Sequence, residues 1–424
     1  MQLFEFSANL AGWISRIISF LVLYKMLMTV IGFFTKRKYP SARENHNYAV
    51  VIAARNEESV IAELIRSVFS QAYPREMLTV FVVADNCTDR TAEIARKEGA
   101  ICYERDDAEH RTKGFALKYL FEKIKEDYGE DAFEGFFVFD ADNVLKRDFI
   151  ARMNEAFDAG EKVIVGYRNT KNFSDNWISA SYALHWLRTA RTEHRGRSAV
   201  GLSARVQGTG FLFAKELVKD GWNYTSFTED RAFSADAVVK GIKIAYCDNA
   251  EFYDEQPRNL RISARQRIRW AKGHLQSFRE SGMKLLKAAA QRKSFVCYDM
   301  FWTVVPENLV SFLLRFSALL FGLFALSGDA QAKTLFINYA KNFGAAWLGA
   351  SLTAAYVLIM ERKRIAGMSA LRKTAYCVLF PLFDLIGLLS TLYALFARVE
   401  WKPIPHTART SMEELENARG ERHK

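Results

Sequence analysis

Long apolar segments lie near both ends of the chain, and their length predicts membrane-spanning helices. Residues 17–34 form the first segment, with Lys25 as its one interruption. Three more follow at 309–326, 343–360 and 376–397. A run of about 18 or more apolar residues is long enough to cross a bilayer as a helix. We therefore expect one N-terminal anchor and about three C-terminal spans.

Basic residues beside these segments predict how the chain crosses the membrane. Lys36, Arg37 and Lys38 follow the first segment directly, and "ERKRIAGMSALRKT" (361–374) separates the last two. Because basic loops stay on the cytoplasmic side, both places are expected in the cytoplasm. No small-residue cleavage site follows the first segment, so we expect it to stay as an anchor. Simple counting puts the C-terminal tail outside, unless one segment is re-entrant.

Between these ends the pattern changes to short apolar runs that alternate with amphipathic segments. Three runs have the length of buried strands, namely "YAVVIAA" (48–54), "LTVFVVAD" (78–85) and "GFFVFDAD" (135–142). Continuous apolar strands of this kind are typical of sheets that are covered on both faces.

Helices are expected between the strands. Residues 60–69 place their apolar side chains on one helical face. A second helix is expected to begin at Thr88 and to end at Gly99, in the usual C-terminal position of glycine. Alternation of strands and helices predicts an α/β domain with a mixed, mostly parallel sheet and helices on both faces.

Acidic residues stand where two of the predicted strands end. Asp85 ends the second, while Asp140 and Asp142 end the later one. Ligands of such sheets bind at the carboxyl ends of the strands, and paired carboxylates suit a hard divalent ion such as Mg²⁺ or Mn²⁺. Turn or capping chemistry is the alternative for any single Asp. No GxGxxG follows the first strand, so a dinucleotide site is not expected.

The amino-acid composition limits the kinds of partner that the chain is expected to bind. The chain has 424 residues and a net charge of +11, which favours an anionic partner such as lipid, nucleic acid or a phosphorylated substrate. Five scattered cysteines lack metal-type spacing, and seven histidines form no HxH or HExxH motif. These features favour a reducing compartment and no structural zinc. Nucleic acid is not expected, because no recognised nucleic-acid module accompanies the basic residues.

The segment "ARQRIRWAKGHLQSF" (264–278) concentrates arginines around one Gln and one Trp. One interpretation is an interfacial amphipathic helix, with basic residues at the lipid headgroups and Trp at the membrane boundary. The other is an anion site, because arginine forks match phosphate oxygens. Both interpretations can hold for one helix.

Seven short motifs occur in an order that resembles a known family. They are "VVIAARNEE" (50–58), "VVADNCTDRTAE" (82–93), "KGFAL" (113–117), "DAD" (140–142), "GTG" (208–210), "TED" (228–230) and "QRIRW" (266–270). The chain resembles cellulose, chitin and hyaluronan synthases, which are membrane-embedded, processive, inverting glycosyltransferases of family 2. The resemblance covers about residues 46–280. Ala53 departs from it, standing where the family often has Pro.

The resemblance implies a GT-A type domain and a role for each motif. Asp230 would be the catalytic base and Glu229 would orient it. Asp140 and Asp142 would hold Mg²⁺ or Mn²⁺. The other implied contacts are to the nucleotide and diphosphate by Asp85, Lys113, Asp140, Gln266, Arg267 and Arg269, and to the acceptor by Trp270, Gly208, Thr209 and Gly210.

The function implied by the resemblance is stepwise elongation of a β-linked polysaccharide from a UDP-sugar, coupled to its passage through the membrane. UDP-glucose with β-1,4 or mixed β-1,3/1,4 linkage is the leading expectation, while N-acetylglucosamine stays open. One alternative is a non-processive enzyme that adds one or a few sugars to a membrane lipid. Another is a nucleotide-binding transporter or scaffold, which would not need a base. A homo-oligomer is left open.

The expected organisation places the enzyme in the cell membrane as a multi-pass protein with its catalytic domain in the cytoplasm. Arg315 and Asp384 fall inside predicted spans, where charge is costly and often lines a polar path or pairs with a partner. The expected divisions are an anchor at 1–40, a glycosyltransferase domain at 41–262, interfacial helices at 263–308, transmembrane helices at 309–397 and a charged tail at 398–424.

Overall fold

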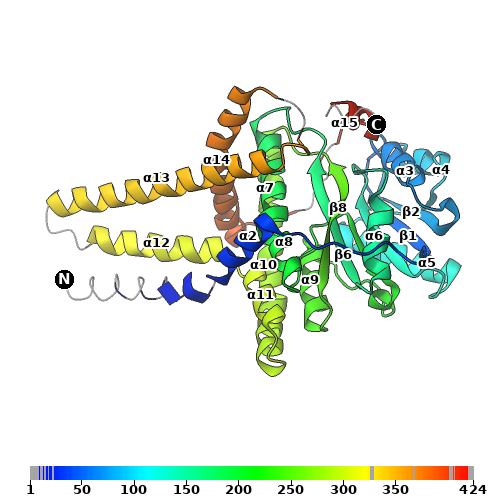
Figure 1. Ribbon diagram of the computed structural model, residues 1–424, viewed down its shortest axis with the longest axis horizontal. Helices are drawn as coiled ribbons and strands as arrows, with labels where there is room; N and C mark the ends of the chain where they lie inside the picture. Colours follow the sequence, from blue (N-terminus) through cyan, green and yellow to red (C-terminus); the bar gives the residue numbers. More distant parts are fainter. Residues whose placement is uncertain are drawn as a thin grey trace.

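A computed structural model describes the chain from residue 23 to residue 418, and only scattered positions before residue 23. Outside the described part are residues 325–328, 366–367, 401–403 and 405, and several side chains between 307 and 335. An α/β body occupies one side of the molecule, and long helices project from the other (Figure 1).

Among the described residues, eight strands form one sheet. They are β1 (Tyr48–Ala54), β2 (Leu78–Asp85), β3 (Ile101–Arg105), β4 (Gly135–Asp140), β5 (Val144–Leu145), β6 (Val163–Thr170), β7 (Phe211–Ala214) and β8 (Ile244–Asp254). Their order across the sheet is β3-β2-β1-β4-β7-β6-β8-β5. The first four strands run parallel, and β7 is antiparallel to both β4 and β6. The predicted mixed, mostly parallel sheet is confirmed.

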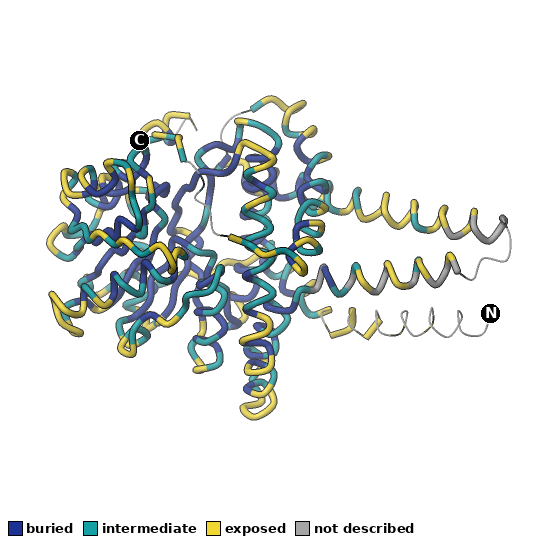
Figure 2. Tube along the Cα trace, turned by 180° about the vertical axis from the view of Figure 1, so that it is seen from behind, coloured by how far each residue is buried: buried dark blue, intermediate teal, exposed yellow. Residues whose placement is uncertain are grey.

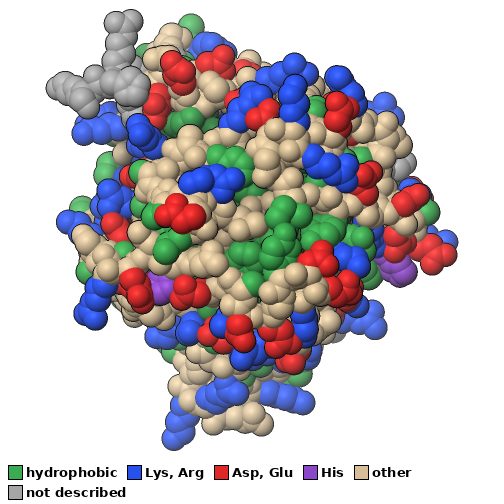
Figure 3. Space-filling view, turned by 90° about the vertical axis from the view of Figure 1, so that its right-hand side faces the viewer, with side chains coloured by type: hydrophobic (Ala, Val, Ile, Leu, Met, Phe, Trp, Pro, Cys, Tyr) green, Lys and Arg blue, Asp and Glu red, His purple; other side chains and the backbone are tan. Residues whose placement is uncertain are grey.

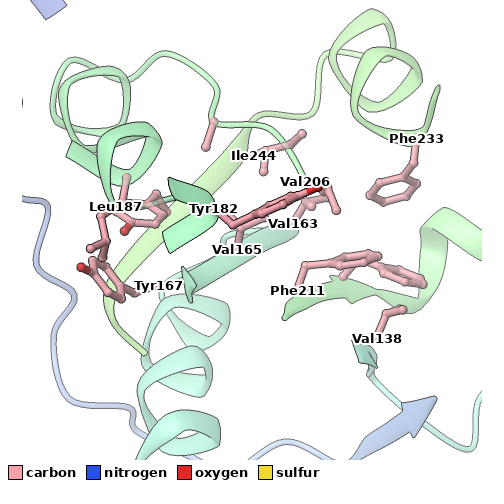
Figure 4. Close-up of a cluster of buried hydrophobic side chains, with 14 of the residues drawn as sticks. Val138, Val163, Val165, Tyr167, Tyr182, Leu187, Val206, Phe211, Phe233 and Ile244 are labelled. Atoms are coloured by element: carbon pink, nitrogen blue, oxygen red, sulfur yellow. The ribbon is translucent and has the colours of Figure 1, made fainter. Parts of the chain in front are cut away.

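Helices cover both faces of the sheet. One face is covered by α3 (Ile61–Phe69), α4 (Thr91–Lys97) and α6 (Phe149–Asp158), and the other by α5 (Lys113–Tyr128), α7 (Trp177–Thr189) and α9 (Glu229–Val239). Figure 4 shows part of the second core, where Phe233 of α9 faces Phe211 of β7 with ring centroids 5.9 Å apart. The sheet is the most deeply buried part of the molecule (Figure 2).

Two predicted boundaries need correction. The helix expected to begin at Thr88 begins at Thr91, because Asp89 accepts hydrogen bonds from the Thr91 N–H (3.0 Å) and hydroxyl, which fixes the turn before the helix. The predicted strand 135–142 ends at Asp140, and the Asn143 N–H bonds the Asp140 carbonyl at 3.0 Å. Asp142 therefore lies in a turn after the strand.

The basic segment 264–278 belongs to one continuous helix, α10 (Leu260–Gln291), which is followed by α11 (Phe295–Val304). α10 packs against α9, α11 and the later helix α14 (Ala370–Phe396), so it lies between the sheet body and the projecting helices. The shorter elements are η1 (Arg75–Met77), the π-helix η2 (Ala190–His194), α8 (Arg195–Ala199), η3 (Lys215–Val218) and α15 (Met412–Ala418), which lies in the charged tail.

The remaining helices are α2 (Tyr24–Phe34), α12 (Glu307–Phe324) and α13 (Asp329–Met360). Among the described residues, two stretches are long and apolar enough to cross a membrane, Phe336–Met360 within α13 and Ala370–Phe396 in α14. They include the predicted span 343–360 and nearly all of 376–397. Phe343 and Leu352 of α13 are exposed, and the projecting helix is coloured largely as exposed or intermediate in Figure 2.

Of the two charged residues predicted inside the spans, the structure describes the side chain of Asp384 but not that of Arg315. Asp384 of α14 pairs with Arg188 of α7 at 3.1 Å, so its carboxylate ties α14 to the sheet body. The Arg315 side chain lies outside the described residues, as do several positions of the predicted span 17–34.

Buried ion pairs connect the sheet body to the surrounding helices, and we call this region the joint. Arg191 pairs with Glu361, which follows α13, and Arg195 reaches both Glu361 (3.3 Å) and Asp248 of β8. Nearby, α2 crosses α8 so closely that a Cβ at Gly196 would collide with the Met28 carbonyl oxygen. Arg197 of α8 also pairs with Asp299 of α11 at 2.7 Å. The joint is therefore formed by side chains of η2, α8, β8, α11 and the turn after α13.

The face turned away from α12 and α13 carries acidic and basic side chains intermixed around a small apolar area (Figure 3). Acidic and basic side chains are thus both spread over this face.

Candidate active site

A cavity of about 280 Å³ lies at the carboxyl ends of the parallel strands. Register explains why the strand-terminal acids meet there: Ala53 of β1 is opposite both Val83 of β2 and Asp140 of β4. The cavity lining includes most of the predicted site residues: Asp85, Lys113, Asp140, Asp142, Gly208, Glu229, Asp230, Gln266, Arg269 and Trp270.

Asp140 is held by a lysine from a neighbouring helix. The Lys113 ammonium, at the start of α5, donates to the Asp140 carboxylate and to the Gly208 carbonyl oxygen (2.7 Å). Burial disfavours ionisation of Asp140, but Lys113 outweighs it and holds the pKa of this carboxyl below its usual value. Asp140 is therefore ionised at neutral pH.

Asp142 is oriented by its own surroundings. One carboxylate oxygen accepts the Glu255 N–H at 2.8 Å, and the other accepts from the Asn143 amide at 3.2 Å. The Thr209 hydroxyl bonds Asn143 and also accepts the Asp140 N–H at 2.8 Å. The turn that carries both aspartates is thus fixed before any ligand binds.

The GTG segment reaches the cavity at its first residue alone. Gly208 lines it, whereas Thr209 is buried in the bracing contacts of the aspartate turn. Gly210 has a φ of +68° and lies so close to Phe252 that a Cβ would collide with its ring. Within the described structure, Thr209 and Gly210 support the site and do not line it.

Glu229 and Asp230 begin α9, directly after Thr228. Burial, and then the charges of Asp230 and Asp140, raise the pKa of Glu229 to about 7, although Lys113 opposes the shift. α10 approaches closely here, because Gly273 has no side chain to clash with Thr228. That contact positions the start of α9 against the basic helix.

The QRIRW motif divides between two faces of α10. Gln266, Arg269 and Trp270 line the cavity, since residues i, i+3 and i+4 share one side of a helix. Arg267 points away, with its guanidinium 3.6 Å from the centre of the Phe383 ring in α14. The structure therefore does not bring Arg267 to the diphosphate position that the motif implies.

Trp270 stands against two aromatic edges. Its ring lies 5.9 Å from Tyr182 and 5.7 Å from Trp186, at interplanar angles of 77° and 67°. No described ring stacks face to face on Trp270 in these contacts. A broad indole face at a cavity wall can hold the C–H surface of a sugar.

The sequence interpretation missed a segment from the far end of the chain. His406 lines the cavity, its Nδ1 lies 2.9 Å from Glu57, and its carbonyl oxygen accepts the Ser59 hydroxyl at 2.6 Å. The N–H groups of Thr407 and Ala408 donate to Glu255 at 2.9 and 2.8 Å. No spacing rule could have linked positions 349 residues apart, such as Glu57 and His406.

His406 adds a positive charge beside the aspartates. Burial opposes the charge, but Asp142 and Glu57 outweigh it and raise the pKa of the imidazole to about 10. The imidazolium thus balances part of the negative charge around Asp142.

A second missed group surrounds Asp254 at the end of β8. Arg168 pairs with Asp254, and its guanidinium lies 3.9 Å above the Trp186 ring. The Gln256 amide donates to Asp254 at 2.5 Å. Burial raises the pKa of Asp254 to about 6, with Asp142 and Asp140 acting in the same direction against Arg168. Asp140, Asp142 and Asp254 therefore lie near enough for each to affect the charge of the others, and carboxylate oxygens are the ligands that a hard divalent cation prefers.

Asp85 differs from the other acids. Arg105 of β3 holds it at 2.5 Å, and Arg55 approaches at 3.9 Å. Burial raises the pKa of Asp85 although Arg105 opposes the shift. Its arginine neighbours place it at the edge of the cavity beside β3.

Comparison with known proteins gives a family and a fold. The model of the glycosyltransferase-like family 2 matches residues 46–273, more than half of the chain. A probable glycosyltransferase, YdaM of Bacillus subtilis, is 22% identical over 309 residues, covering 67% of this chain and 70% of that protein. Poly-beta-1,6-N-acetyl-D-glucosamine synthase of Staphylococcus aureus (strain COL) is 23% identical over 316 residues, covering 71% and 72%.

Among solved structures, the chain resembles the mannosyltransferase PcManGT from Pyrobaculum calidifontis, determined with GDP-Man and Mn²⁺. The TM-score is 0.59 at 17% identity, and the match covers 92% of this chain and 99% of that one. The likeness confirms the GT-A type fold that the motifs implied.

Proposed function

Because this chain belongs to glycosyltransferase family 2, we propose that it elongates a β-linked polysaccharide by inverting transfer from a UDP-sugar. The observation that carries the proposal is convergence on one cavity. Carboxylates of the "DAD" and "TED" motifs and the Gln266, Arg269 and Trp270 face of α10 line the same space. A carrier or scaffold would bind a nucleotide without needing the second carboxylate pair.

Asp230 is the proposed base. In the transfer, the acceptor hydroxyl attacks the anomeric carbon from the side opposite the diphosphate, and Asp230 takes the hydroxyl proton. The carbon–oxygen bond to the diphosphate breaks at the same time, so configuration inverts without a covalent enzyme intermediate. A carboxylate is a sufficient base when proton removal accompanies attack.

Glu229 supports this base. Its carboxyl has a pKa of about 7, so at neutral pH it is protonated in a large fraction of molecules. A protonated carboxyl can donate a hydrogen bond, and it adds no second negative charge beside Asp230. Glu229 is therefore proposed to position Asp230 or the acceptor hydroxyl.

The leaving diphosphate needs positive charge. Arg269 and Gln266 are proposed to bind its oxygens, since preorganised cations at developing charge give the largest catalytic contribution. Asp140, Asp142 and Asp254 offer carboxylate oxygens to the same cavity, which suits a divalent ion, and Asp142 and Asp140 are its proposed ligands. When bound, Mg²⁺ or Mn²⁺ supplies further charge against the diphosphate.

The nucleotide is proposed to lie towards β2 and β3, beside Asp85, with Lys113 holding Asp140 in place below it. On the opposite wall, Trp270 is proposed as the platform for the terminal acceptor sugar. Keeping this sugar stacked between additions would make the reaction processive. The donor stays a choice between UDP-glucose, favoured by the motif resemblance, and UDP-N-acetylglucosamine, favoured by the name of the Staphylococcus aureus relative.

We also propose that α2, α12, α13 and α14 embed the protein in the cell membrane as a multi-pass enzyme, with the cavity on the cytoplasmic side. The support is the length and apolar composition of the two stretches in α13 and α14 and the basic residues Lys36–Lys38 after α2. A product leaving the Trp270 wall would then meet helices α7, α10 and α14 at the membrane boundary.

Purified protein in lipid vesicles, incubated with a panel of labelled UDP-sugars, tests the proposal. We expect label from one UDP-sugar in long chains that a linkage-specific glycosidase digests. Trp270→Ala should keep UDP binding and shorten or abolish the chains. Products limited to one or two sugars on extractable lipid would replace the polysaccharide synthase with a lipid glycosyltransferase. No transfer from any nucleotide sugar would overturn the enzymatic proposal itself.

A further inference from the structure

A group of side chains with metal-ligating atoms lies at the end of the sheet opposite the cavity. Glu44 and His46 precede β1, and Asp158 ends α6. One ligand atom from each of the three residues lies within 4.8 Å of the others. None of these residues contributes to the proposed glycosyl transfer, so their arrangement has to be explained separately.

The imidazole of His46 is oriented by a carboxylate on its far side. Its Nδ1 lies 2.7 Å from Glu134, which fixes a proton on that nitrogen when the ring is neutral. The other nitrogen, Nε2, then carries the lone pair and faces Asp158 at 3.3 Å. A carboxylate that orients a histidine in this way is the usual outer partner of a metal-bound imidazole.

The carboxylates are held in place as well. One oxygen of Asp158 accepts the Arg43 N–H at 2.9 Å, which leaves the other facing His46. The remaining oxygen of Glu134 accepts the Asn47 N–H at 3.0 Å. All these contacts involve the linker just before β1.

Asn154 of α6 holds the backbone of the linker before β1 by two hydrogen bonds. Its amide donates to the Glu44 carbonyl oxygen at 2.9 Å, and its oxygen accepts the His46 N–H at 3.3 Å. The backbone that carries Glu44 and His46 is therefore preorganised, and of the three clustered residues Glu44 is exposed while His46 and Asp158 are half-buried.

Charge balance favours an additional cation. Three carboxylates, those of Glu44, Glu134 and Asp158, surround one imidazole. Within the described residues, no lysine or arginine side chain forms a direct ion pair with any of the three, although the charges of Lys215 and Arg43 act on Glu134 and Asp158 from farther away. Even a protonated His46 would balance only one of these charges.

The distance between His46 Nε2 and Asp158 also matches the distance between two ligands of a small tetrahedral metal ion. With metal–ligand bonds of about 2.0–2.1 Å, two ligands of a tetrahedral zinc ion lie about 3.3–3.4 Å apart. His46 Nε2 and Asp158 are separated by 3.3 Å. Imidazole with carboxylates is a donor set that suits Zn²⁺ more than Mg²⁺.

We propose that Glu44, His46 and Asp158 bind a divalent transition-metal ion of the Zn²⁺ type, with Glu134 as the positioning partner of His46. The site fastens the linker between α2 and β1 to the end of α6. It contains no cysteine, so the absence of cysteine motifs does not exclude it. Its role is structural: it fixes the point where the chain passes from the membrane-proximal helix into the sheet.

Cobalt binding to the purified full-length protein tests the proposal, because tetrahedral Co²⁺ has visible absorption that depends on its ligands. All variants carry Asp142→Asn, which weakens the proposed active-site metal equally in each. We expect His46→Ala to lose about one equivalent of bound Co²⁺ and its absorption, and Glu44→Gln to bind more weakly. His110→Ala is the matched control, since His110 contacts a single carboxylate, Asp107, at 3.0 Å and should change nothing.

Thermal unfolding supplies a second readout. Zn²⁺ should raise the unfolding midpoint of the Asp142→Asn protein and of its His110→Ala form, and raise it less or not at all with His46→Ala. If His46→Ala fails to fold, the exposed Glu44→Gln variant carries the comparison. Equal Co²⁺ stoichiometry and equal Zn²⁺ response with and without His46 or Glu44 would overturn the proposal and leave His46 as an ion-pair bridge alone.

Discussion

Arginines occupy both the cavity and the joint, but their surroundings differ. In the joint, Arg195 contacts both Asp248 and Glu361, and Arg197 bonds Asp299 at 2.7 Å. In the cavity, no ion pair within the described residues joins Arg269 to a carboxylate. Burial lowers the pKa of Arg269, although Glu229 and Asp140 favour its charge. Paired arginines hold the fold, whereas Arg269 remains available for an anionic ligand.

This difference gives each group its own expected phenotype. Removing one partner of a buried ion pair leaves an uncompensated charge and costs about 3–5 kcal/mol of folding free energy. Removing an arginine that binds only the ligand leaves the stability of the folded protein nearly unchanged. It removes stabilisation of the transition state of the reaction instead. Activity and stability should therefore separate between the two regions.

The largest effect is expected from the aspartate turn. Asp142→Ala removes the proposed metal ligand, so transfer should fall to the limit of detection. Wild-type activity should likewise disappear with EDTA and return with Mg²⁺ or Mn²⁺. Asp85→Ala is the control and should lose less, because Arg105 rather than the metal is the partner of Asp85. Full wild-type activity in excess EDTA would exclude the metal.

A hundredfold loss of activity is expected from substitution of Arg269. Arg269→Ala should lower kcat/KM for the UDP-sugar about a hundredfold, since one preorganised group at developing charge contributes that much. Arg267→Ala is the matched control on the same helix, and it should change kcat/KM by less than about threefold because Arg267 packs on Phe383. Equal losses in the two variants would contradict the division of the motif between two helix faces.

Substitutions in the joint should lower the stability of the fold and leave activity largely intact. Arg197→Ala leaves Asp299 buried without its cation, and we expect a loss of about 3–5 kcal/mol, seen as a thermal midpoint several degrees lower. Activity per folded molecule should stay close to wild type at low temperature. A variant as stable as wild type but inactive would place Arg197 in the site and remove the distinction between the two regions.

A smaller, pH-dependent effect is expected from the C-terminal segment. The folded pKa of His406 is about 10, above the ordinary histidine value, so its charged form is bound more tightly in the folded state. Its stabilising contribution should be complete below about pH 6.5 and disappear as the pH rises through about 10.

His406→Gln tests this sign. The difference in thermal midpoint between wild type and His406→Gln should be largest at acidic pH and vanish at alkaline pH. A difference that grows with pH would mean that the neutral imidazole, and not the imidazolium, makes the contacts with Glu57 and Asp142.

The elements that the sequence predicted well are those fixed by local patterns. β1 and β2 coincide with the apolar runs 48–54 and 78–85, because strands buried on both faces admit few polar residues. Asp85 at the end of β2 and Asp140 at the end of β4 reach one cavity because parallel strands share one edge, and the acids of "TED" reach it from the start of α9. Gly99, at φ +90°, ends its helix as expected.

The other placements depend on contacts that local patterns do not encode. The motif "QRIRW" implies one shared role, although a helix turns about 100° per residue and sends Arg267 to another face. Thr209 looked like an acceptor contact but braces Asn143. His406 reaches the cavity only through tertiary packing and has no signal in its own neighbourhood, whereas Asp254 ends β8 and has the same strand-terminal signal as Asp85 and Asp140.

The account rests most directly on Asp230 as the base of a transfer reaction in this cavity. The decisive measurement compares transfer rate and UDP affinity in Asp230→Asn, which keeps the shape of the side chain but removes the proton acceptor. We predict a transfer rate lower by about a hundredfold or more, with UDP affinity unchanged from wild type. Near wild-type transfer by purified Asp230→Asn would contradict the account.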